Sequence, residues 1–254
     1  MRSPNDALKE NLVNVHERIF KAASRSGRRP DEITLIAVSK THSARRIQAL
    51  YETGVRHFGE NRVQERESKA PSLAGLEIVW HMIGHVQKNK AARAAALFDS
   101  VDSVDSIALA TKLDRAREEF AVGEAEMMAG AGSSIRRVPS RPLRVLLEIK
   151  LDPEPAKSGL QSEDVPRVVQ ALSKMPHLEL SGLMGVPPYD DNPENVRPHF
   201  QRLRNLRDAL RAELGPQALP VLSMGMSHDF EIAIEEGSTE IRVGTAVFGQ
   251  REIE

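Results

Sequence analysis

The sequence predicts an α/β protein built as a closed barrel of eight parallel strands, a (β/α)8 or TIM barrel. Strand-like and helix-like segments alternate eight times within 254 residues, which matches the repeat number and length of such a barrel. The main alternative is an open doubly wound sheet, which carries a G-x-G-x-x-G turn after its first strand when it binds a dinucleotide. This chain has Ser39-Lys40-Thr41-His42 at that point. We therefore favour the closed barrel.

An amphipathic helix is expected before the first strand. Residues 5–26 carry apolar side chains at helical spacing, and Gly27 and Pro30 follow as residues that end helices. The apolar positions of this stripe are Leu8, Leu12, Val15, Ile19 and Ala22 or Ala23.

The eight strands are expected where short apolar runs occur. The first run, 33–38, is continuous and rich in branched residues, which is typical of a parallel strand buried on both faces. The expected strands are 33–38, 55–58, 77–83, 98–104, 144–151, 178–184, 219–222 and 240–243.

The helices between the strands are predicted from apolar spacing and from capping residues. The clearest helix has Asn192 as its N-cap and Pro193 as its first residue, and Gly215 and Pro216 end it. Its apolar stripe is Phe200, Leu203, Leu206, Leu210 and Leu214. The other helices are expected near 43–53, 61–69, 87–97, 106–120, 162–174 and 228–236.

Residues 121–142 interrupt this alternation. The segment is rich in Gly, Ala, Ser and Pro, a composition typical of a mobile loop. We expect a flexible insertion within one domain that spans 1–254, and not a boundary between two domains.

The composition excludes several classes of function. Lys and Arg (35) nearly balance Asp and Glu (36), so no global positive field attracts nucleic acid or an acidic membrane. The absence of cysteine excludes disulfides, thiol nucleophiles and thiolate metal sites. The first residues lack an apolar signal segment, and no stretch approaches ~18 apolar residues. We expect a cytoplasmic monomer without a membrane or nucleic-acid partner.

Polar residues and glycines gather where the predicted strands end. In a barrel of this kind, the loops after the carboxyl ends of the strands form the active site. Those loops hold Lys40, Asn61, His81, Gly84, His85, Lys157–Gly159, Tyr189, Ser223–Ser227, Arg242, Gly244 and Thr245.

Lys40 is expected to face the loops after the seventh and eighth strands, because closure of the barrel makes the first strand a neighbour of the eighth. In those loops Gly225 and Gly244 offer backbone N–H groups, and Ser227 and Thr245 add hydroxyls, a set that suits a phosphate. A lysine beside a phosphate site indicates a phosphorylated aldehyde held as a Schiff base. Pyridoxal 5'-phosphate (PLP) is the cofactor of that description.

Arg242 lies two residues before Gly244 and is expected to point into the barrel mouth. There its guanidinium would meet the pyridine nitrogen of the cofactor and disfavour protonation of the ring. The alternative is an ion pair with Glu240 or with another carboxylate at the rim. The alternative for Lys40 is a solvated strand end.

A metal site is not expected. His81 and His85 are four residues apart, but Gly84 interrupts the element and no carboxylate completes a ligand set. The acidic row Asp99, Asp102 and Asp105 also resembles a ligand set, although Asp105-Ser106 is better explained as the cap of the following helix.

Seven segments in fixed order carry a family resemblance. They are 37–41, 58–65, 80–90, 157–159, 182–184, 222–229, and 237–239 with 241–249. Together they closely resemble the YggS/PROSC family of pyridoxal phosphate homeostasis proteins, from the first helix to the last residues. The resemblance implies a fold type III barrel like the N-terminal domain of alanine racemase, preceded by an extra helix.

The resemblance also implies the roles of several residues. Lys40 would form the Schiff base with PLP. Arg242 would lie at the ring nitrogen, and Asn61 would line the pocket. Further expected cofactor contacts are Ser227, Gly244 and Thr245 at the phosphate. Apart from the resemblance, we expect Met224 either in the core or packed against the cofactor ring, and His81, Lys150 and Tyr189 are further pocket candidates. Lys150 departs from the family, whose members commonly carry Asn at this position, and it would change the charge of the pocket.

The function implied is a carrier that holds PLP, keeps its aldehyde from stray amines and delivers it to apoenzymes. No catalytic residue is expected, because only five residues follow Gly249 and no second domain would supply a further acid/base group. One alternative is a PLP-dependent amino-acid racemase or related enzyme that uses Tyr189 or His81 as that group. Another is a lyase whose lysine binds a sugar phosphate without any cofactor.

Overall fold

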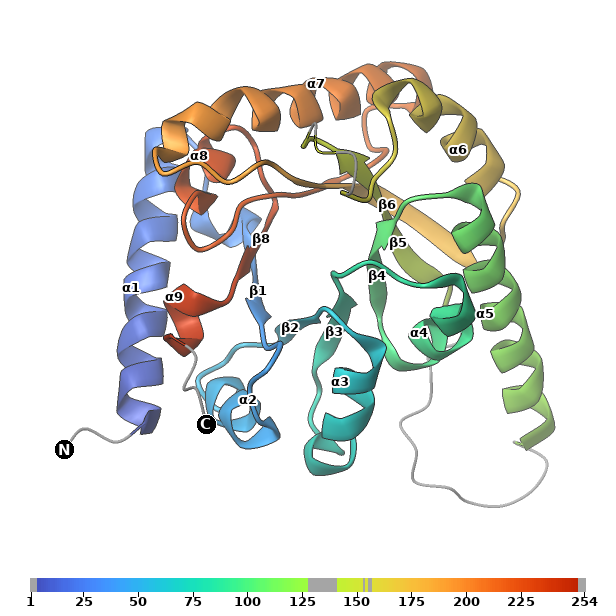
Figure 1. The fold of residues 1–254 in the computed structure, drawn as a ribbon, viewed down its shortest axis with the longest axis horizontal. Coiled ribbons are helices and arrows are strands. Elements are labelled where there is room, and N and C mark those ends of the chain that lie inside the picture. The colour runs from blue at the N-terminus through green and yellow to red at the C-terminus, as the bar shows by residue number, and fades with distance from the viewer. Residues whose placement is uncertain (1–3, 128–140, 153, 155–156, 251–254) are drawn as a thin grey trace.

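The computed structural model describes residues 4–127, 141–152, 154 and 157–250 (Figure 1). Its eight strands form a closed barrel in chain order, and the pairing of β1 with β8 closes it. This confirms the barrel predicted from the sequence. The strands are β1 (Thr34–Val38), β2 (His57–Glu60), β3 (Val79–Met82), β4 (Ser100–Val104), β5 (Leu143–Lys150), β6 (Leu178–Val186), β7 (Val221–Ser223) and β8 (Glu240–Val243).

Helices form a ring around the strands (Figure 1). They are α1 (Pro4–Arg25), α2 (Ala44–Tyr51), α3 (Val63–Lys69), α4 (Ala91–Leu97), α5 (Ile107–Met127), α6 (Val165–Leu172), α7 (Arg197–Leu214), α8 (Phe230–Glu235) and α9 (Thr245–Phe248). The extra N-terminal helix α1 packs against α8 and α9, so the two ends of the sequence meet. No helix among the described residues is both long enough and apolar enough to cross a membrane.

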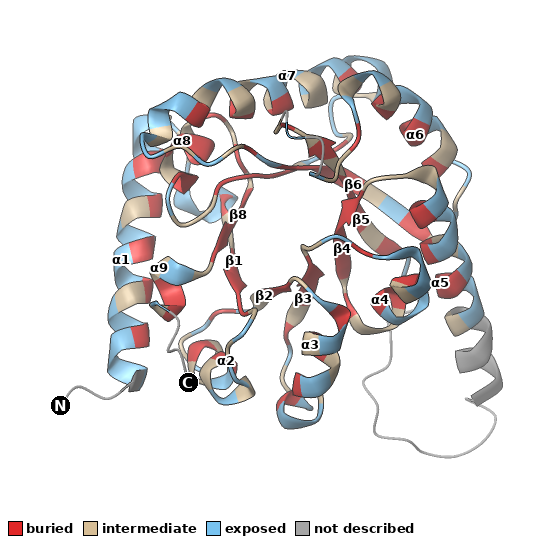
Figure 2. Cartoon of the chain, in the orientation of Figure 1, coloured by how far each residue is buried: buried red, intermediate tan, exposed pale blue. Residues whose placement is uncertain are grey.

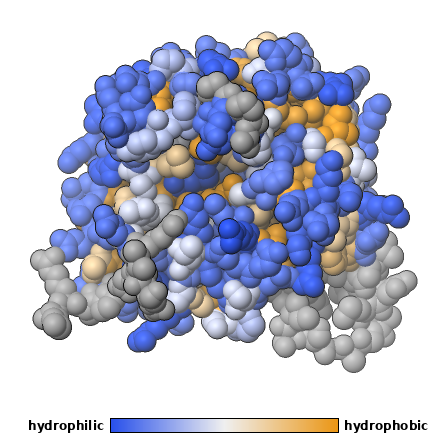
Figure 3. Space-filling view, in the orientation of Figure 1, coloured by the Kyte–Doolittle hydropathy of each residue, from blue (hydrophilic) through white to orange (hydrophobic). Residues whose placement is uncertain are grey.

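The main hydrophobic core lies between the strands and the helices. Buried residues concentrate on the strands and on the barrel-facing sides of the helices (Figure 2). On β8, Ile241 and Val243 belong to this core. Because side chains alternate along a strand, Glu240 and Arg242 point to the other side, into the barrel. In the space-filling view, hydrophilic side chains cover most of the visible face of the molecule (Figure 3).

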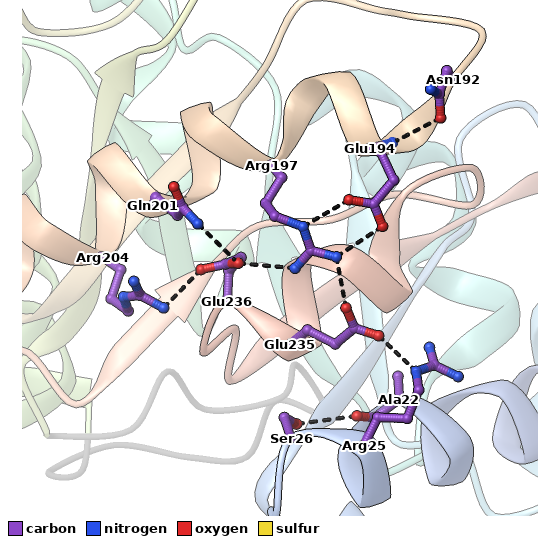
Figure 4. A network of polar contacts seen from close by, with 10 residues as sticks. All are labelled: Ala22, Arg25, Ser26, Asn192, Glu194, Arg197, Gln201, Arg204, Glu235 and Glu236. Carbon is purple, nitrogen blue, oxygen red and sulfur yellow. Dashed lines mark hydrogen bonds and ion pairs between the residues drawn. The ribbon is translucent and has the colours of Figure 1, made fainter.

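Ion pairs join three helices of the ring, as Figure 4 shows. Arg197 of α7 contacts Glu235 of α8 and neighbouring Glu236, with 2.8 Å between nitrogen and oxygen in each case. Glu235 in turn lies 2.7 Å from Arg25 of α1. Partly exposed pairs of this kind contribute little singly, but this chain of contacts fixes α1 against α7 and α8.

Three sequence predictions need correction. The loop predicted for 121–142 starts too early, because α5 continues to Met127. The helix propensity of Ala, Glu and Met in this stretch outweighs the helix-weakening effect of Gly123. The rest of that prediction, 128–140, lies outside the described residues. Strand β2 lies about two residues later than predicted, because Gly59 and Glu60 continue to pair with β3. Leu214 is 49% exposed at the end of α7 and does not join its apolar stripe.

Candidate functional site

Lys40 lies in a tight turn directly after β1. The turn is closed by the His42 N–H, which donates to the Ser39 carbonyl at 3.0 Å. Thr41 adopts a φ of +67°, in the left-handed region that β-branched residues rarely enter. The lysine therefore leaves the barrel from a defined turn and not from a continuing strand.

This turn lies beside the loop that follows β8. Ala37 pairs with Val243 in the barrel register, so the residues after each strand emerge side by side. The His42 ring stacks on the ring of Phe248 in α9, with 4.4 Å between ring centres. The structure thus brings Lys40 and Thr245 to the same end of the barrel, as the sequence predicted from closure.

The loops after β7 and β8 are also joined to each other. Ser227 accepts a hydrogen bond at its Oγ from the Ala246 N–H, at 3.2 Å. Ser227 and Gly244 are partly buried and Thr245 is exposed. Gly225 is placed differently from the other three residues, because its backbone packs closely against α8. Two hydroxyls and the backbone of Gly244 therefore gather beside the turn of Lys40.

Arg242 lies inside the barrel, almost completely buried. Its guanidinium donates to the Ser223 hydroxyl at 2.7 Å and to the Gly185 carbonyl at 2.9 Å. The alternative of an ion pair with Glu240 is not realised, because Glu240 pairs with Arg144 at 2.6 Å. Burial lowers the pKa of Arg242, although nearby carboxylates oppose this effect. The guanidinium of Arg242 thus donates hydrogen bonds to two neutral oxygens.

His81 is completely buried in a polar network inside the barrel. Its Nδ1 lies 3.0 Å from Asp102, and its Nε2 lies 3.0 Å from Nδ1 of His57. Burial alone would lower the pKa of His81, but Asp102 raises it above the usual value. Both ring nitrogens already have protein partners, so the structure does not place His81 as a free acid or base in an open pocket.

The same network forms the one grouping of possible metal ligands found among the described residues. His81, Asp102 and Glu240 bring ligand atoms within 4.8 Å of one another. The guanidinium of Arg144 already pairs with Glu240 and lies close enough to Asp102 to lower its pKa. The guanidinium therefore already offsets part of the negative charge of this grouping. His85, the other candidate, does not belong to this grouping; its side chain is 53% exposed and contacts Asp105 at 3.0 Å.

Of the two places expected for Met224, the core or the cofactor ring, the structure shows the core. Its side chain is 0% exposed and belongs to the main core outside the strands. Its N–H donates to the Glu240 carbonyl, so it takes part in the barrel backbone. We therefore leave Met224 out of the site.

The comparisons with known proteins identify the family of this chain. The model of the alanine racemase N-terminal domain matches residues 6–252. The pyridoxal phosphate homeostasis protein of Pseudomonas aeruginosa is 40% identical over 247 residues, which cover 96% of each chain. That of Aquifex aeolicus is 39% identical over 243 residues, covering 95% of this chain and 97% of its own. The chain belongs to the pyridoxal phosphate homeostasis proteins.

A solved structure of similar fold supports this assignment. PipY of Synechococcus elongatus, whose structure contains bound PLP, superposes with a TM-score of 0.75 at 36% identity. The match covers 92% of this chain and 100% of PipY. The resemblance stated from the sequence motifs is confirmed.

Asn61 lies at the end of β2 in this homeostasis-family barrel, where its backbone packs against Gly84. A Cβ built on Gly84 would lie 2.8 Å from the Asn61 Cα, closer than real side chains approach. The Gly84 carbonyl also accepts a hydrogen bond from Ser103 at 2.7 Å. Gly84 thus lets the loops after β2 and β3 meet beside the end of β4.

Replacing Gly84 by alanine is therefore expected to destabilise the fold by about 2 kcal/mol, because the new methyl group overpacks this junction. Urea unfolding would measure the loss. Gly244→Ala is the matched comparison, since its Cβ would meet nothing closer than 3.5 Å. Equal stabilities of the two variants would contradict this account.

Lys150 ends β5 on the side of the strand that faces the barrel mouth. Glu148, two residues earlier, shares that side and accepts a hydrogen bond from Ser158 at 2.9 Å. Burial raises the pKa of Glu148 above its usual value. Sequence reasoning missed Glu148, although its spacing from Lys150 on one strand was the available signal. A carboxylate therefore lies on the same side of β5 as Lys150.

Tyr189 lies on the loop after β6 and is 76% exposed. Its ring packs against His228, with 5.4 Å between ring centres. A hydrogen bond with Asp191 raises the pKa of the Tyr189 hydroxyl. The structure places Tyr189 at the surface, beside the loop after β7 that holds Ser227.

His57 makes this barrel sensitive to acid. Burial, together with His81 and Arg144, lowers its pKa from 6.5 to about 4, against the weaker effect of Asp102 and Asp99. The unfolded chain thus takes up this proton at a higher pH than the folded chain. The resulting stability is complete above pH 6.5 and is lost as the pH falls toward 4.

We expect this loss to be about 1–2 kcal/mol, after allowing for the partial exposure of His57. His57→Gln should lose less stability than the wild type between pH 6.5 and 4.5, measured by urea unfolding at several pH values. Replacement of the exposed His16 by Gln should retain the wild-type profile. If the stability of His57→Gln and that of the wild type changed equally with pH, the role given to His57 would be contradicted.

Proposed function

We propose that this chain binds PLP, with Lys40 as the point of covalent attachment, and acts in PLP homeostasis as a carrier. The observation that supports this most is the meeting of the Lys40 turn with the loops after β7 and β8. The names of the relatives and the PLP bound to PipY point to the same ligand.

The residues at this end of the barrel fit the chemical groups of PLP. The hydroxyls of Ser227 and Thr245 and the Gly244 N–H suit a phosphate, and Arg242 is a buried cation suited to an uncharged ring nitrogen. Asn61 and Lys150 would line the pocket. When bound, the cofactor supplies an aldehyde that condenses with a lysine amine and a conjugated ring that absorbs near-visible light.

The surroundings of the two candidate acid/base groups favour a carrier over an enzyme. Both ring nitrogens of His81 are engaged inside the barrel. Tyr189 lies at the surface and hydrogen-bonds with Asp191. Efficient racemisation needs a second acid/base group across the cofactor, and neither residue is held ready for that task. Arg242 would further weaken the ring as an electron sink by disfavouring protonation of its nitrogen.

Titration of the purified protein with PLP tests the binding proposal. We expect a near-visible absorption band that saturates at one PLP per chain, and a reduced phosphopyridoxyl mass on the Lys40 peptide after borohydride treatment. A colourless protein under these conditions would favour the alternative of a lyase that acts on sugar phosphates.

The carrier role needs a separate experiment. The loaded protein is mixed with an apoenzyme that depends on PLP, and recovery of its activity is followed beside an equal amount of free PLP in the presence of a competing amine. Protection and transfer by the carrier are expected. Rapid turnover of single-enantiomer amino acids that is lost in Tyr189→Phe would instead establish the racemase alternative.

A further inference from the structure

The turn that carries Lys40 is tied down on both sides of the lysine. Before it, the Ser39 carbonyl accepts a hydrogen bond from Lys69 Nζ at 2.9 Å, and the Ser39 hydroxyl donates to Glu60 at 2.6 Å. After it, the Thr41 N–H donates to Glu65 Oε2 at 2.8 Å. The two residues next to Lys40 in the sequence are therefore both held by side chains of β2 and α3.

These holding side chains also contact one another. Lys69 Nζ lies 2.7 Å from Glu60 and 3.7 Å from Glu65. The Glu60 side chain is 0% exposed and that of Lys69 is 10% exposed. Burial of an ion pair costs hydration that its attraction often fails to regain, and apolar residues would fill the same space more cheaply. Stability alone is thus a poor explanation for charges at this place.

The backbone conformation of the turn indicates a role for these charged side chains. Thr41 has a φ of +67°, a conformation that costs roughly 1–2 kcal/mol for a residue with a side chain. Such a conformation persists only where surrounding contacts determine it. The hydrogen bond from the Thr41 N–H to Glu65 and that from Lys69 to the Ser39 carbonyl are such contacts. With them in place, the backbone on both sides of Lys40 is held.

We propose that Glu65 and Lys69, through Glu60, are positioning residues that hold the Lys40 turn so that its amine reaches the aldehyde of PLP. The inference rests on the proposed function. When Lys40 Nζ condenses with the aldehyde, a C=N bond replaces the C=O bond and the carbonyl oxygen leaves as water. The positioning residues take no part in this exchange.

The test compares two glutamates of the same helix. Glu65→Ala removes the acceptor of the Thr41 N–H, whereas Glu65→Gln keeps an acceptor oxygen. Glu67→Ala is the matched control, since Glu67 contacts Arg93 on α4 and not the turn. Glu65→Ala is expected to slow covalent attachment and weaken PLP binding by about tenfold, the value of one lost hydrogen bond. Glu65→Gln should stay within about threefold of the wild type, and Glu67→Ala should match it.

A second ligand separates positioning from general damage to the pocket. Pyridoxine 5'-phosphate has the ring and the phosphate of PLP but no aldehyde, so its binding does not need Lys40. We expect Glu65→Ala to bind it as the wild type does, with unchanged circular dichroism. The inference would be overturned if Glu65→Ala weakened the binding of both ligands equally, or the binding of neither. A wild-type protein that binds neither ligand would instead overturn the proposed function.

Discussion

Lys40→Ala is expected to abolish covalent attachment of PLP completely. Alanine offers no amine, and the turn that carries Lys40 lies beside the loop after β8. The near-visible band produced by attachment should be absent, and borohydride should fix no phosphopyridoxyl mass on any peptide. Binding of pyridoxine 5'-phosphate should persist, because Ser227, Gly244 and Thr245 are unchanged.

The control for this variant is an exposed lysine far from the barrel mouth. Lys112 lies on the outer face of α5, and Lys112→Ala should attach PLP as the wild type does. Mass mapping of Lys40→Ala also examines Lys150, the other lysine at the mouth. A label that appears on Lys150 in the wild type, in place of Lys40, would contradict the assignment.

Glu240→Gln is expected to destabilise the protein by about 3 kcal/mol or more, the cost of removing one partner from a buried ion pair. Glu240 is 5% exposed inside the barrel and pairs with Arg144 at 2.6 Å. The remaining guanidinium cannot lose its proton at neutral pH. It would remain charged in the barrel, with only Asp102 and Glu179 to compensate it. Urea unfolding at pH 7 measures the difference.

An exposed ion pair provides the comparison. Arg115 and Glu119 lie on α5 with side chains 79% and 67% exposed. Glu119→Gln should change stability by less than about 0.5 kcal/mol, as exposed helical pairs do. A Glu240→Gln variant as stable as Glu119→Gln would show that the barrel interior is more hydrated than its burial indicates.

The sequence allowed the parts of the site that depend on barrel closure to be predicted. Lys40 and Thr245 lie at the same end of the barrel because β1 pairs with β8, and this was predicted from the number of strands and the missing dinucleotide-binding turn. The cap at Ser106 was also predictable, and its hydroxyl accepts the Leu109 N–H at 3.2 Å. Topology and capping are local or countable properties, which is why a single sequence contains them.

The direction of individual side chains was harder to predict. Met224 and His81 each end or follow a strand, yet one points into the outer core and the other into the barrel. A shift of one residue in the phase of a strand reverses every side chain. The contacts that hold the Lys40 turn were also out of reach, since Lys69 and Ser39 lie 30 residues apart. Nothing in their local sequence connects them.

The docking of α1 against α8 and α9 and the pairing of β1 with β8 have a consequence for synthesis of the protein. A nascent chain leaving the ribosome cannot complete its fold until residues near Val243 emerge. At ~5–20 residues per second, that delay is on the order of 10 s or more. Throughout it, the part of α1 that packs against α8 and α9 and the edge of β1 that pairs with β8 lack these partners. Newly made copies are thus most prone to aggregate before their last tenth is translated.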